Sequence, residues 1–415
     1  MSLAHSKASL IGGTLIITGT IMGAGMLAIP TATAGIWFYP SLILLALTWL
    51  CMMTSGLLIL EANTHYSLEA SFPTMVKDLL GPFWYVLNGL SLAFVLYILT
   101  YAYISAGGDL TRHNLNALLG SDQVPYWLGQ TVFFIVLAGC VWFSTLWVTR
   151  FNAILIGGMV LTFVAACSGM VPTASWSVLT NESGAQAGYW GYIWPTLTVA
   201  LASFGFHGNV PSLRRYFQGD ARRVTIAVIS GSFLALLVYV FWQIAVQGNL
   251  PRVAFSPVIA DDGQLSSLID ALSAYTQTGN AMALLSLFTY LAIATSFLGV
   301  TLGLFDFIAD LFSWDDSAFG KAKTAAVTFL PPFIFCLWKP YGFVSAIGYA
   351  GLAATIWVAI IPVLMVYVAR RRFNQQGFRV PGGVVTLAIV MLFGVLNIAA
   401  HFLAQFGIAA QYMPS

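Results

Sequence analysis

Long apolar runs dominate the chain, and short polar or turn-rich stretches separate them. A helix needs roughly 20 predominantly apolar residues to cross a bilayer, and many of these runs reach that length. The pattern predicts about 11 spans, near residues 8–36, 40–64, 84–107, 126–148, 151–171, 191–217, 223–247, 279–310, 322–338, 342–369 and 383–407. None of the longest connections shows signs of a separate domain: 65–83, 108–125, 172–190 and 248–278.

The first predicted span is interrupted at residues 19–30. Gly19, Gly23 and Gly25 fall within seven residues, and Pro30 follows. Glycine weakens a helix, proline removes a hydrogen-bond donor, and lipid tolerates open backbone only where protein or a polar cavity covers it. The stretch predicts either a helix broken in mid-membrane to expose backbone to a ligand, or a close packing face, since Gly19 and Gly23 have GxxxG spacing.

The sixth predicted span is interrupted in the same way at residues 202–212. Gly205 and Gly208 are followed by Pro211. Paired Gly/Pro interruptions at matching positions of two halves are a sequence pointer to the central site of a transporter. The pairing favours two broken helices over a packing face.

These patterns predict an all-α polytopic membrane protein that forms a single transmembrane domain over residues 1–415. Its core is an inverted repeat of five plus five helices, at 8–171 and 191–369, with an eleventh helix appended at 383–407. Helices 1 and 6 are the broken ones, as an inverted topology requires.

Composition agrees with this class, because hydrophobic residues make up 59% of the chain and charged residues 7%, with a mean hydropathy of +0.86. Soluble domains carry about 25% charged residues. The basic residues then set the orientation, since cytoplasmic loops are enriched in Lys and Arg. With the N-terminus in the cytoplasm and the C-terminus outside, three of the 16 basic residues lie outside (Arg112, Arg252 and Lys339) and thirteen inside: Lys7, Lys77, Arg150, Arg214, Arg215, Arg222, Arg223, Lys321, Lys323, Arg370, Arg371, Arg372 and Arg379.

The two breaks offer what a zwitterionic amino acid needs. Exposed N–H groups at the start of a second half-helix, at Gly23, Ala24 and Gly25, suit a carboxylate. Free carbonyls at the end of a first half-helix, at residues 203–206, suit an ammonium group. No lysine or arginine lies in either break, which favours neutral amino acids over anions.

Side chains outside the glycines extend the candidate site. Tyr97, Tyr101 and Ser105 share one face of the third span at i, i+4 spacing, so Tyr101 either faces substrate or hydrogen-bonds between helices.

Ionisable residues inside spans are functional candidates because each costs roughly 2.5–3.5 kcal/mol at a helix centre. Glu61 lies late in the second span and His207 inside the second break. Together they could carry a coupling proton, or each could make only a structural hydrogen bond. Thr295 and Ser296 in the eighth span could coordinate a cation such as sodium, or back-bond to their own helix.

No metal cluster, phosphate loop or nucleophile–base motif appears in the sequence. We therefore expect no enzyme activity, no cofactor and no metal, and the basic residues serve topology rather than nucleic acid.

The motifs resemble the bacterial hydroxy/aromatic amino acid permeases. Gly-Thr-Ile-Met-Gly-Ala-Gly-Met at 19–26 and Ser-Phe-Gly-Phe-His-Gly-Asn-Val-Pro-Ser at 203–212 carry the likeness, with further agreement at 60–63, 94–105, 296–306 and 348–351. The details are most similar to the tryptophan-specific branch, because of Glu-Ala-Asn at 61–63 and Tyr-Ile-Leu-Thr-Tyr-Ala-Tyr at 97–103.

This resemblance implies an inner-membrane symporter with the amino acid–polyamine–organocation fold, driven by the proton gradient, that takes up L-tryptophan or another aromatic amino acid. It places substrate between helices 1, 3, 6, 8 and 10. An aromatic substrate then needs an apolar pocket, for which we consider Phe204, Phe206 and residues 350–357. The expected substrate-binding residues are Thr20, Gly23, Ala24, Gly25, Tyr101, Ser203, Phe204, Gly205, Phe206, His207, Gly208 and Asn209. Some relatives in the wider superfamily carry a helix 5 lysine that stands in for sodium, but residues 151–171 hold none. Sodium coupling, and a channel or sensor with the same fold, remain alternatives.

Overall fold

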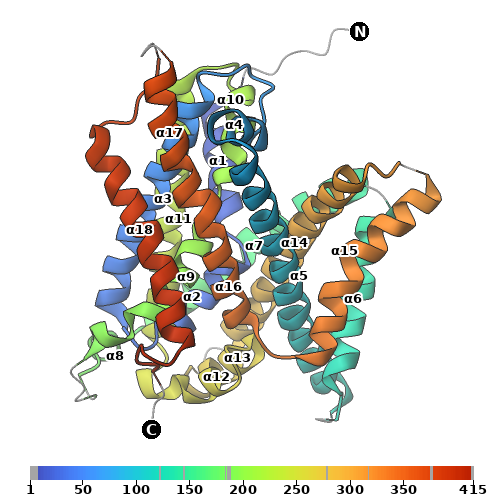
Figure 1. Cartoon of the computed structure of the whole chain (residues 1–415). Helices are drawn as coiled ribbons and strands as arrows, with labels where there is room; N and C mark the ends of the chain where they lie inside the picture. Colours follow the sequence, from blue (N-terminus) through green and yellow to red (C-terminus); the bar gives the residue numbers. More distant parts are fainter. Residues whose placement is uncertain are drawn as a thin grey trace.

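The computed structural model describes residues 8–120, 123–143, 145–182, 184, 188–276, 279–315, 317–373 and 377–412. These residues are helical with short connections (Figure 1). The α-helices are α1 (Leu10–Ile21), α2 (Ala24–Ala32), α3 (Phe38–Asn63), α4 (Phe72–Leu80), α5 (Pro82–Leu119), α6 (Tyr126–Phe143), α7 (Thr145–Met170), α8 (Trp176–Thr180), α9 (Ile193–Ser203), α10 (Val210–Tyr216), α11 (Ala221–Gln247), α12 (Ser256–Ala260), α13 (Leu265–Tyr275), α14 (Gly279–Phe312), α15 (Ala318–Trp338), α16 (Phe343–Thr355), α17 (Ile361–Arg372) and α18 (Gly383–Gln405).

Five further short helices complete the described secondary structure. Four are 3₁₀ turns and one is a π-helical turn, namely η1 (Val171–Thr173), η2 (Tyr189–Tyr192), η3 (His207–Asn209), η4 (Arg252–Phe255) and the π turn η5 (Ile356–Ile360).

Both predicted interruptions are breaks in the helices. α1 ends at Ile21 and α2 begins at Ala24, and the two axes are bent by 52°. Gly23 has extended backbone, φ −144° and ψ −160°, which ends the helical run. α9 ends at Ser203, and the chain passes through η3 before α10 starts, with Pro211 in its first turn, where a missing N–H costs nothing.

The chain is an all-helical, multi-pass membrane protein. Among the described residues, seven helices are long and apolar enough to cross a membrane, and eight if the bent α1–α2 pair forms one span. The other predicted spans fall on α6, on the interrupted run from α9 to α10, and on α15, whose two lysines and Pro331–Pro332 pair lower its hydropathy. The count of about eleven spans stays a prediction.

Some predicted boundaries are wrong. α5 continues to Leu119, through much of the expected loop at 108–125, because Asp109 is buried there and accepts hydrogen bonds from the Ser266 backbone and hydroxyl at 3.0 and 2.8 Å. The other three expected loops contain the short helices α4, α8, α12 and α13.

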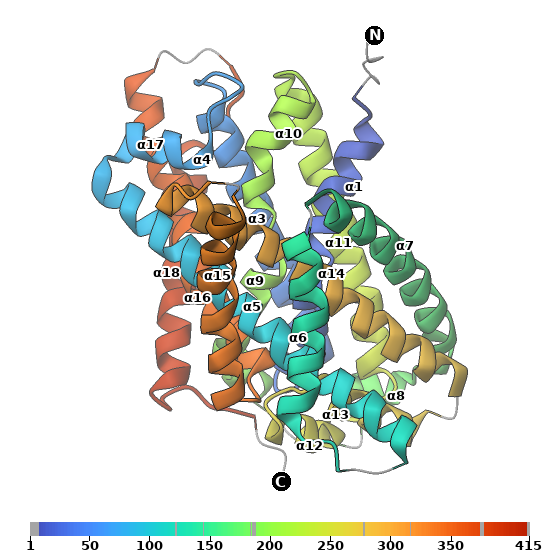
Figure 2. The same ribbon diagram turned by 90° about the vertical axis from the view of Figure 1, so that its right-hand side faces the viewer.

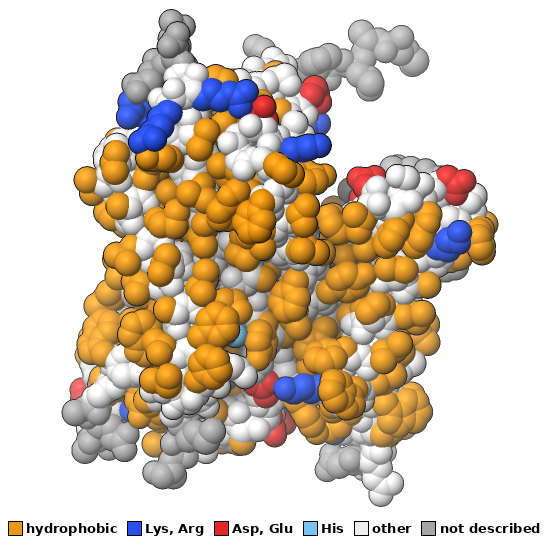
Figure 3. All heavy atoms as spheres, viewed as in Figure 1, with side chains coloured by type: hydrophobic (Ala, Val, Ile, Leu, Met, Phe, Trp, Pro, Cys, Tyr) orange, Lys and Arg blue, Asp and Glu red, His pale blue; other side chains and the backbone are white. Residues whose placement is uncertain are grey.

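The two broken segments lie side by side in the middle of the molecule. α1 packs along α11 and α2 along α9, while α5 packs against α6, α14 and α16 (Figures 1 and 2). α1 begins at the upper end of Figure 1 and α18 ends at the lower end. Hydrophobic side chains cover the middle of the face in Figure 3, and most of the Lys and Arg visible there gather at its upper end.

Candidate functional site

A cavity of about 750 Å³ lies where the two breaks meet. This volume is within the 300–1,000 Å³ typical of small-molecule sites. Its walls come from α1, α2, α3, α5, α7, α9, η3, α14, α16 and η5. The predicted residues that line it are Thr20, Gly23, Ala24, Gly25, Ser203, Gly205, Phe206, His207, Gly208, Asn209, Thr295 and Ser296.

The cavity wall is more exposed beside α1 than beside α16. Leu15 and Ile16 line it from the middle of α1 and are 57% and 43% exposed. Ile347 and Ala350 line it from α16 and are each 1% exposed. The cavity is therefore less enclosed on its α1 side.

The start of α2 presents backbone donors to the cavity. The first N–H groups of a helix have no partner within the helix. The Ala24 N–H donates to Ser296 Oγ at 2.9 Å, and the glycines on either side of it, Gly23 and Gly25, line the cavity. A Cβ at Gly25 would lie 3.2 Å from the Ser203 Cα, so this glycine also permits close packing of α2 on α9. A Cβ at Gly19 would meet no atom within 4 Å, so the predicted packing face of Gly19 and Gly23 is not found, and a ligand at the break stays a prediction.

A second polar contact joins the breaks on the open side of the cavity. Asn209 Nδ2 donates to Thr20 Oγ1 at 2.6 Å, although 189 residues separate them. This bond links η3 to the last turn of α1, between two segments that both face the cavity.

His207 is fully buried in the cavity wall, and neither ring nitrogen has a hydrogen-bond partner among the described residues. The Met52 carbonyl faces the ring without meeting hydrogen-bond geometry. Two other lining side chains, Trp357 at Nε1 and Asn152 at Oδ1, also have a buried polar atom without a partner in the described structure. Unpaired buried polar groups are costly, so these atoms need partners, which water or a ligand in the cavity can supply.

Sequence reasoning missed Tyr103, Met52 and Asn152, which all line the cavity, whereas Trp357 belongs to the predicted apolar stretch 350–357 and also lines it. Tyr103 ends a stripe on one face of α5, preceded by Leu92, Val95, Leu96 and Leu99. That i, i+3, i+4 spacing was a signal the sequence contained.

Trp357 lies in η5, where the backbone widens into a π turn. Ser55 Oγ donates to the Val358 carbonyl of this turn, and Ser91 Oγ donates to the Ala353 carbonyl one turn earlier at 2.6 Å. Single π turns within α-helices are frequent at functional sites. No residue pattern in 350–360 predicts this π turn.

Tyr101 is a predicted site residue that does not line the cavity. Its hydroxyl donates to the carbonyls of Lys339 or Tyr341, at 3.0 and 2.9 Å, and its ring packs on Phe335 at 4.7 Å. Ser105 on the same face donates to the Pro340 carbonyl at 2.8 Å. This face of α5 binds the connection between α15 and α16. The two hydroxyls therefore hydrogen-bond within the protein, which was the alternative to facing substrate.

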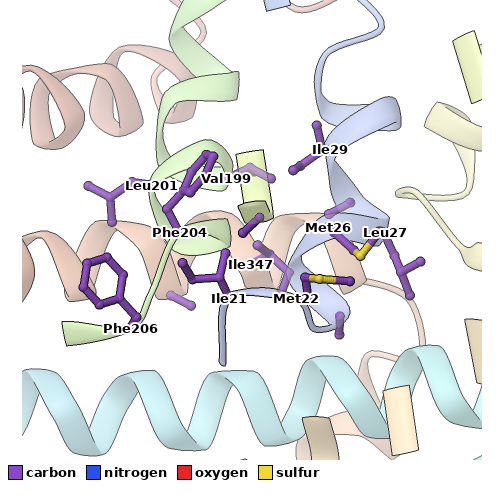
Figure 4. Close-up of a cluster of buried hydrophobic side chains, with 14 of the residues drawn as sticks. Ile21, Met22, Met26, Leu27, Ile29, Val199, Leu201, Phe204, Phe206 and Ile347 are labelled. Atoms are coloured by element: carbon purple, nitrogen blue, oxygen red, sulfur yellow. The ribbon is translucent and has the colours of Figure 1, made fainter. Parts of the chain in front are cut away.

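Phe204 also lies outside the cavity lining. It is 0% exposed and packs edge-on against Tyr239 of α11, with ring centroids 5.0 Å apart. Phe206 does line the cavity, and its ring fills the space above Gly56 of α3. Figure 4 shows the two rings well apart, with Ile21 and Met22 at the end of α1.

Glu61 is bound in a buried ion pair away from the cavity. Arg370 Nε and Nη2 donate to its two carboxylate oxygens at 2.7 and 2.9 Å, and the Val380 N–H donates to Oε2 at 2.8 Å. Its partners lie in α17 and in the segment just before α18, not in a broken helix.

The hydroxyls of Thr295 and Ser296 both have partners in the protein. Thr295 back-bonds to the Ala292 carbonyl at 3.1 Å, and Ser296 accepts from Ala24. No group of three or more His, Cys, Asp or Glu side chains that could hold a metal occurs in the part of the chain that the structure describes.

Comparison with known proteins agrees with this geometry. A family model described as the tryptophan/tyrosine permease family matches residues 6–401. The chain belongs to the tryptophan/tyrosine permease family. It is therefore a transporter and not an enzyme.

The relatives match over nearly the full length. A tryptophan-specific transport protein of Haemophilus influenzae is 52% identical over 99% of both chains. Another of that name from Shigella flexneri is 45% identical over 99% of both, and a tyrosine permease of Enterobacter agglomerans is 38% identical over 95% of both.

A solved structure has a similar fold. A crystal structure of an Eremococcus coleocola manganese transporter mutant superposes with a TM-score of 0.62, covering 99% of this chain and 91% of its own, at 13% identity. At that identity the likeness concerns the fold alone.

Proposed function

We propose that this permease imports tryptophan across a bacterial inner membrane by alternating access, coupled to protons. The observation that carries the proposal is the cavity at the two breaks, which combines helix-end backbone groups with buried aromatic walls. The names of the tryptophan-specific relatives support the substrate.

In this proposal the carboxylate and the indole of the substrate meet different walls. The carboxylate binds N–H groups at the start of α2, at Gly23 and Gly25, where the helix dipole favours an anion. The indole lies against Phe206 and Trp357, with His207 beside it, all of which line the cavity. Tyr101 and Phe204 have no part in binding, since neither lines the cavity.

The architecture we propose has eleven spans, with inverted repeats at 8–171 and 191–369 and the last helix at 383–407. The N-terminus is cytoplasmic and the C-terminus periplasmic. The clustering of visible Lys and Arg at the end where α1 begins supports this orientation (Figure 3). The more exposed part of the cavity wall lies on α1, the half-helix that this orientation places toward the cytoplasm, which supports an inward-open conformation.

His207 is the proposed proton-coupling residue. It is the titratable side chain whose unpaired nitrogens lie in the cavity wall, whereas Glu61 is held by Arg370. Sodium at Thr295 and Ser296 is the alternative, and it would compete with the bonds these hydroxyls already make.

The test is uptake by purified protein in liposomes, with tryptophan, tyrosine and phenylalanine offered separately and pH and sodium gradients imposed one at a time. We expect concentrative tryptophan uptake driven by an inward proton gradient. Sodium-driven uptake would move the coupling site to α14, and preference for tyrosine would change the substrate. Downhill flux only indicates a channel, and binding without uptake indicates a sensor.

A matched pair of variants tests the coupling residue. His207→Gln should lose accumulation driven by the pH gradient, because glutamine does not titrate. His401→Gln is the control, since His401 of α18 packs on Tyr349 and does not line the cavity. An unchanged pH dependence in His207→Gln removes His207 from coupling.

A further inference from the structure

One buried hydroxyl lies between the ends of the two broken helices. Tyr239 of α11 is 0% exposed, and its hydroxyl oxygen is 2.8 Å from the Ile21 carbonyl oxygen and 2.5 Å from the Ser203 carbonyl oxygen. Ile21 is the last residue of α1 and Ser203 the last of α9. The tyrosine ring is held in place by Phe204, which packs edge-on against it.

The geometry provides two acceptors for one proton. A phenol has a single O–H, so it can donate to only one of the two carbonyls at a time. Each carbonyl also lies at a helix C-terminus, where the helix dipole concentrates about half a negative charge. The two helix ends therefore favour a second donor beside the tyrosine hydroxyl, and one that carries a positive charge.

That second donor can arrive from the cavity. Ile21 and Ser203 both line the cavity, whereas Tyr239 does not. The hydroxyl thus approaches the two carbonyls from α11, and the cavity borders the same two residues. A primary ammonium group carries three N–H donors and fits such a pair of oxygens.

We propose that Tyr239 is a positioning residue that holds the ends of α1 and α9 together as a paired acceptor for the substrate ammonium group. In the empty protein its hydroxyl donates to one carbonyl. With substrate bound, it keeps that carbonyl in place while the ammonium group donates to the other. This inference rests on the proposed function, because it assumes an amino acid in the cavity.

The test compares two ligands that differ only in the ammonium group. L-Tryptophan and indole-3-propionate share the ring and the carboxylate, and the second lacks the amine. Purified full-length Tyr239→Phe should bind tryptophan at least about tenfold more weakly than wild type, because hydrogen bonds to a charged donor are among the stronger ones. It should bind indole-3-propionate within about twofold of wild type. In uptake, its half-saturating tryptophan concentration should rise while the maximal rate holds.

Tyr97→Phe is the matched control. Its hydroxyl donates to the Val327 carbonyl of α15 at 2.8 Å, and Tyr97 does not line the cavity. Removing this hydroxyl deletes the same kind of bond away from the breaks, so both ligands should bind as in wild type.

The outcomes separate the two proposals. If wild type binds tryptophan and Tyr239→Phe weakens both ligands equally, or lowers only the maximal rate, Tyr239 is a structural tyrosine and the inference is wrong. If wild type binds indole-3-propionate too weakly to measure, the uptake kinetics of Tyr239→Phe decide. A raised half-saturating tryptophan concentration at an unchanged maximal rate supports the inference, and a lowered maximal rate alone contradicts it. If wild type does not bind tryptophan at all, the proposed function fails and the inference falls with it.

Discussion

Glu61 allows a sharp test, because a structural role and a coupling role predict opposite results for Glu61→Gln. The side chains of Glu61 and Arg370 are 3% and 10% exposed, and two N–H···O bonds of 2.7 and 2.9 Å join them. Arg370 also donates to the carbonyls of Val380 and Gly383 at 3.2 and 3.1 Å. The pair thus fastens the end of α3 to α17 and to the start of α18.

Breaking a buried ion pair by removing one charge costs about 3–5 kcal/mol, because the remaining charge stays buried and unpaired. A glutamine retains one acceptor oxygen, but its NH₂ would face the Val380 N–H or an Arg370 N–H, both of which are donors. We therefore expect Glu61→Gln to lower the free energy of unfolding by about 3 kcal/mol. The apparent Tm of the purified protein should fall by roughly 5 °C.

Two further variants make the measurement specific. Glu69→Gln removes the carboxylate of an exposed ion pair with Arg215, 77% and 51% exposed, and should cost less than about 1 kcal/mol. The double variant Glu61→Leu/Arg370→Met should be more stable than the sum of its single variants, by about 2 kcal/mol. A Glu61→Gln protein as stable as wild type, with uptake that no longer responds to a pH gradient, would refute the structural role and restore Glu61 as a proton carrier.

Three glycine substitutions test how closely the helices pack. Gly25→Ala places a Cβ 3.2 Å from the Ser203 Cα and should lower tryptophan uptake about tenfold. Gly89→Ala, in α5 outside the cavity lining, meets no atom within 4 Å and should transport normally; equal uptake by the two variants would contradict a tight fit between α2 and α9. Gly351→Ala places a Cβ 1.9 Å from the Thr198 carbonyl oxygen, so it should separate α16 from α9 and destabilise the protein by about 1–3 kcal/mol or more. Thermal unfolding of the purified variant checks this, and a wild-type Tm would show that the contact relaxes freely.

The helices and their two breaks could be predicted from the sequence, because they depend on local chemistry. Apolar runs of bilayer length predicted the helices, since lipid leaves a backbone few other ways to satisfy its polar groups. The two Gly/Pro interruptions predicted the broken helices for the same reason, because such residues weaken a helix wherever they fall. Most of the residues named around them line the cavity.

Tertiary structure decided which side chains face that cavity and which partners the polar groups find. Tyr101 and Tyr103 are two residues apart on α5, yet one binds the α15–α16 connection and the other lines the cavity, because successive residues of a helix point in different directions and only the neighbouring helices decide which direction faces the ligand. Arg370 lies 309 positions from Glu61, and Tyr239 lies 218 and 36 positions from the carbonyls it approaches. Contacts over such separations leave no trace in local periodicity. The sequence therefore predicted the breaks, whereas the residues that hold them together could be identified only from the packing of the helices.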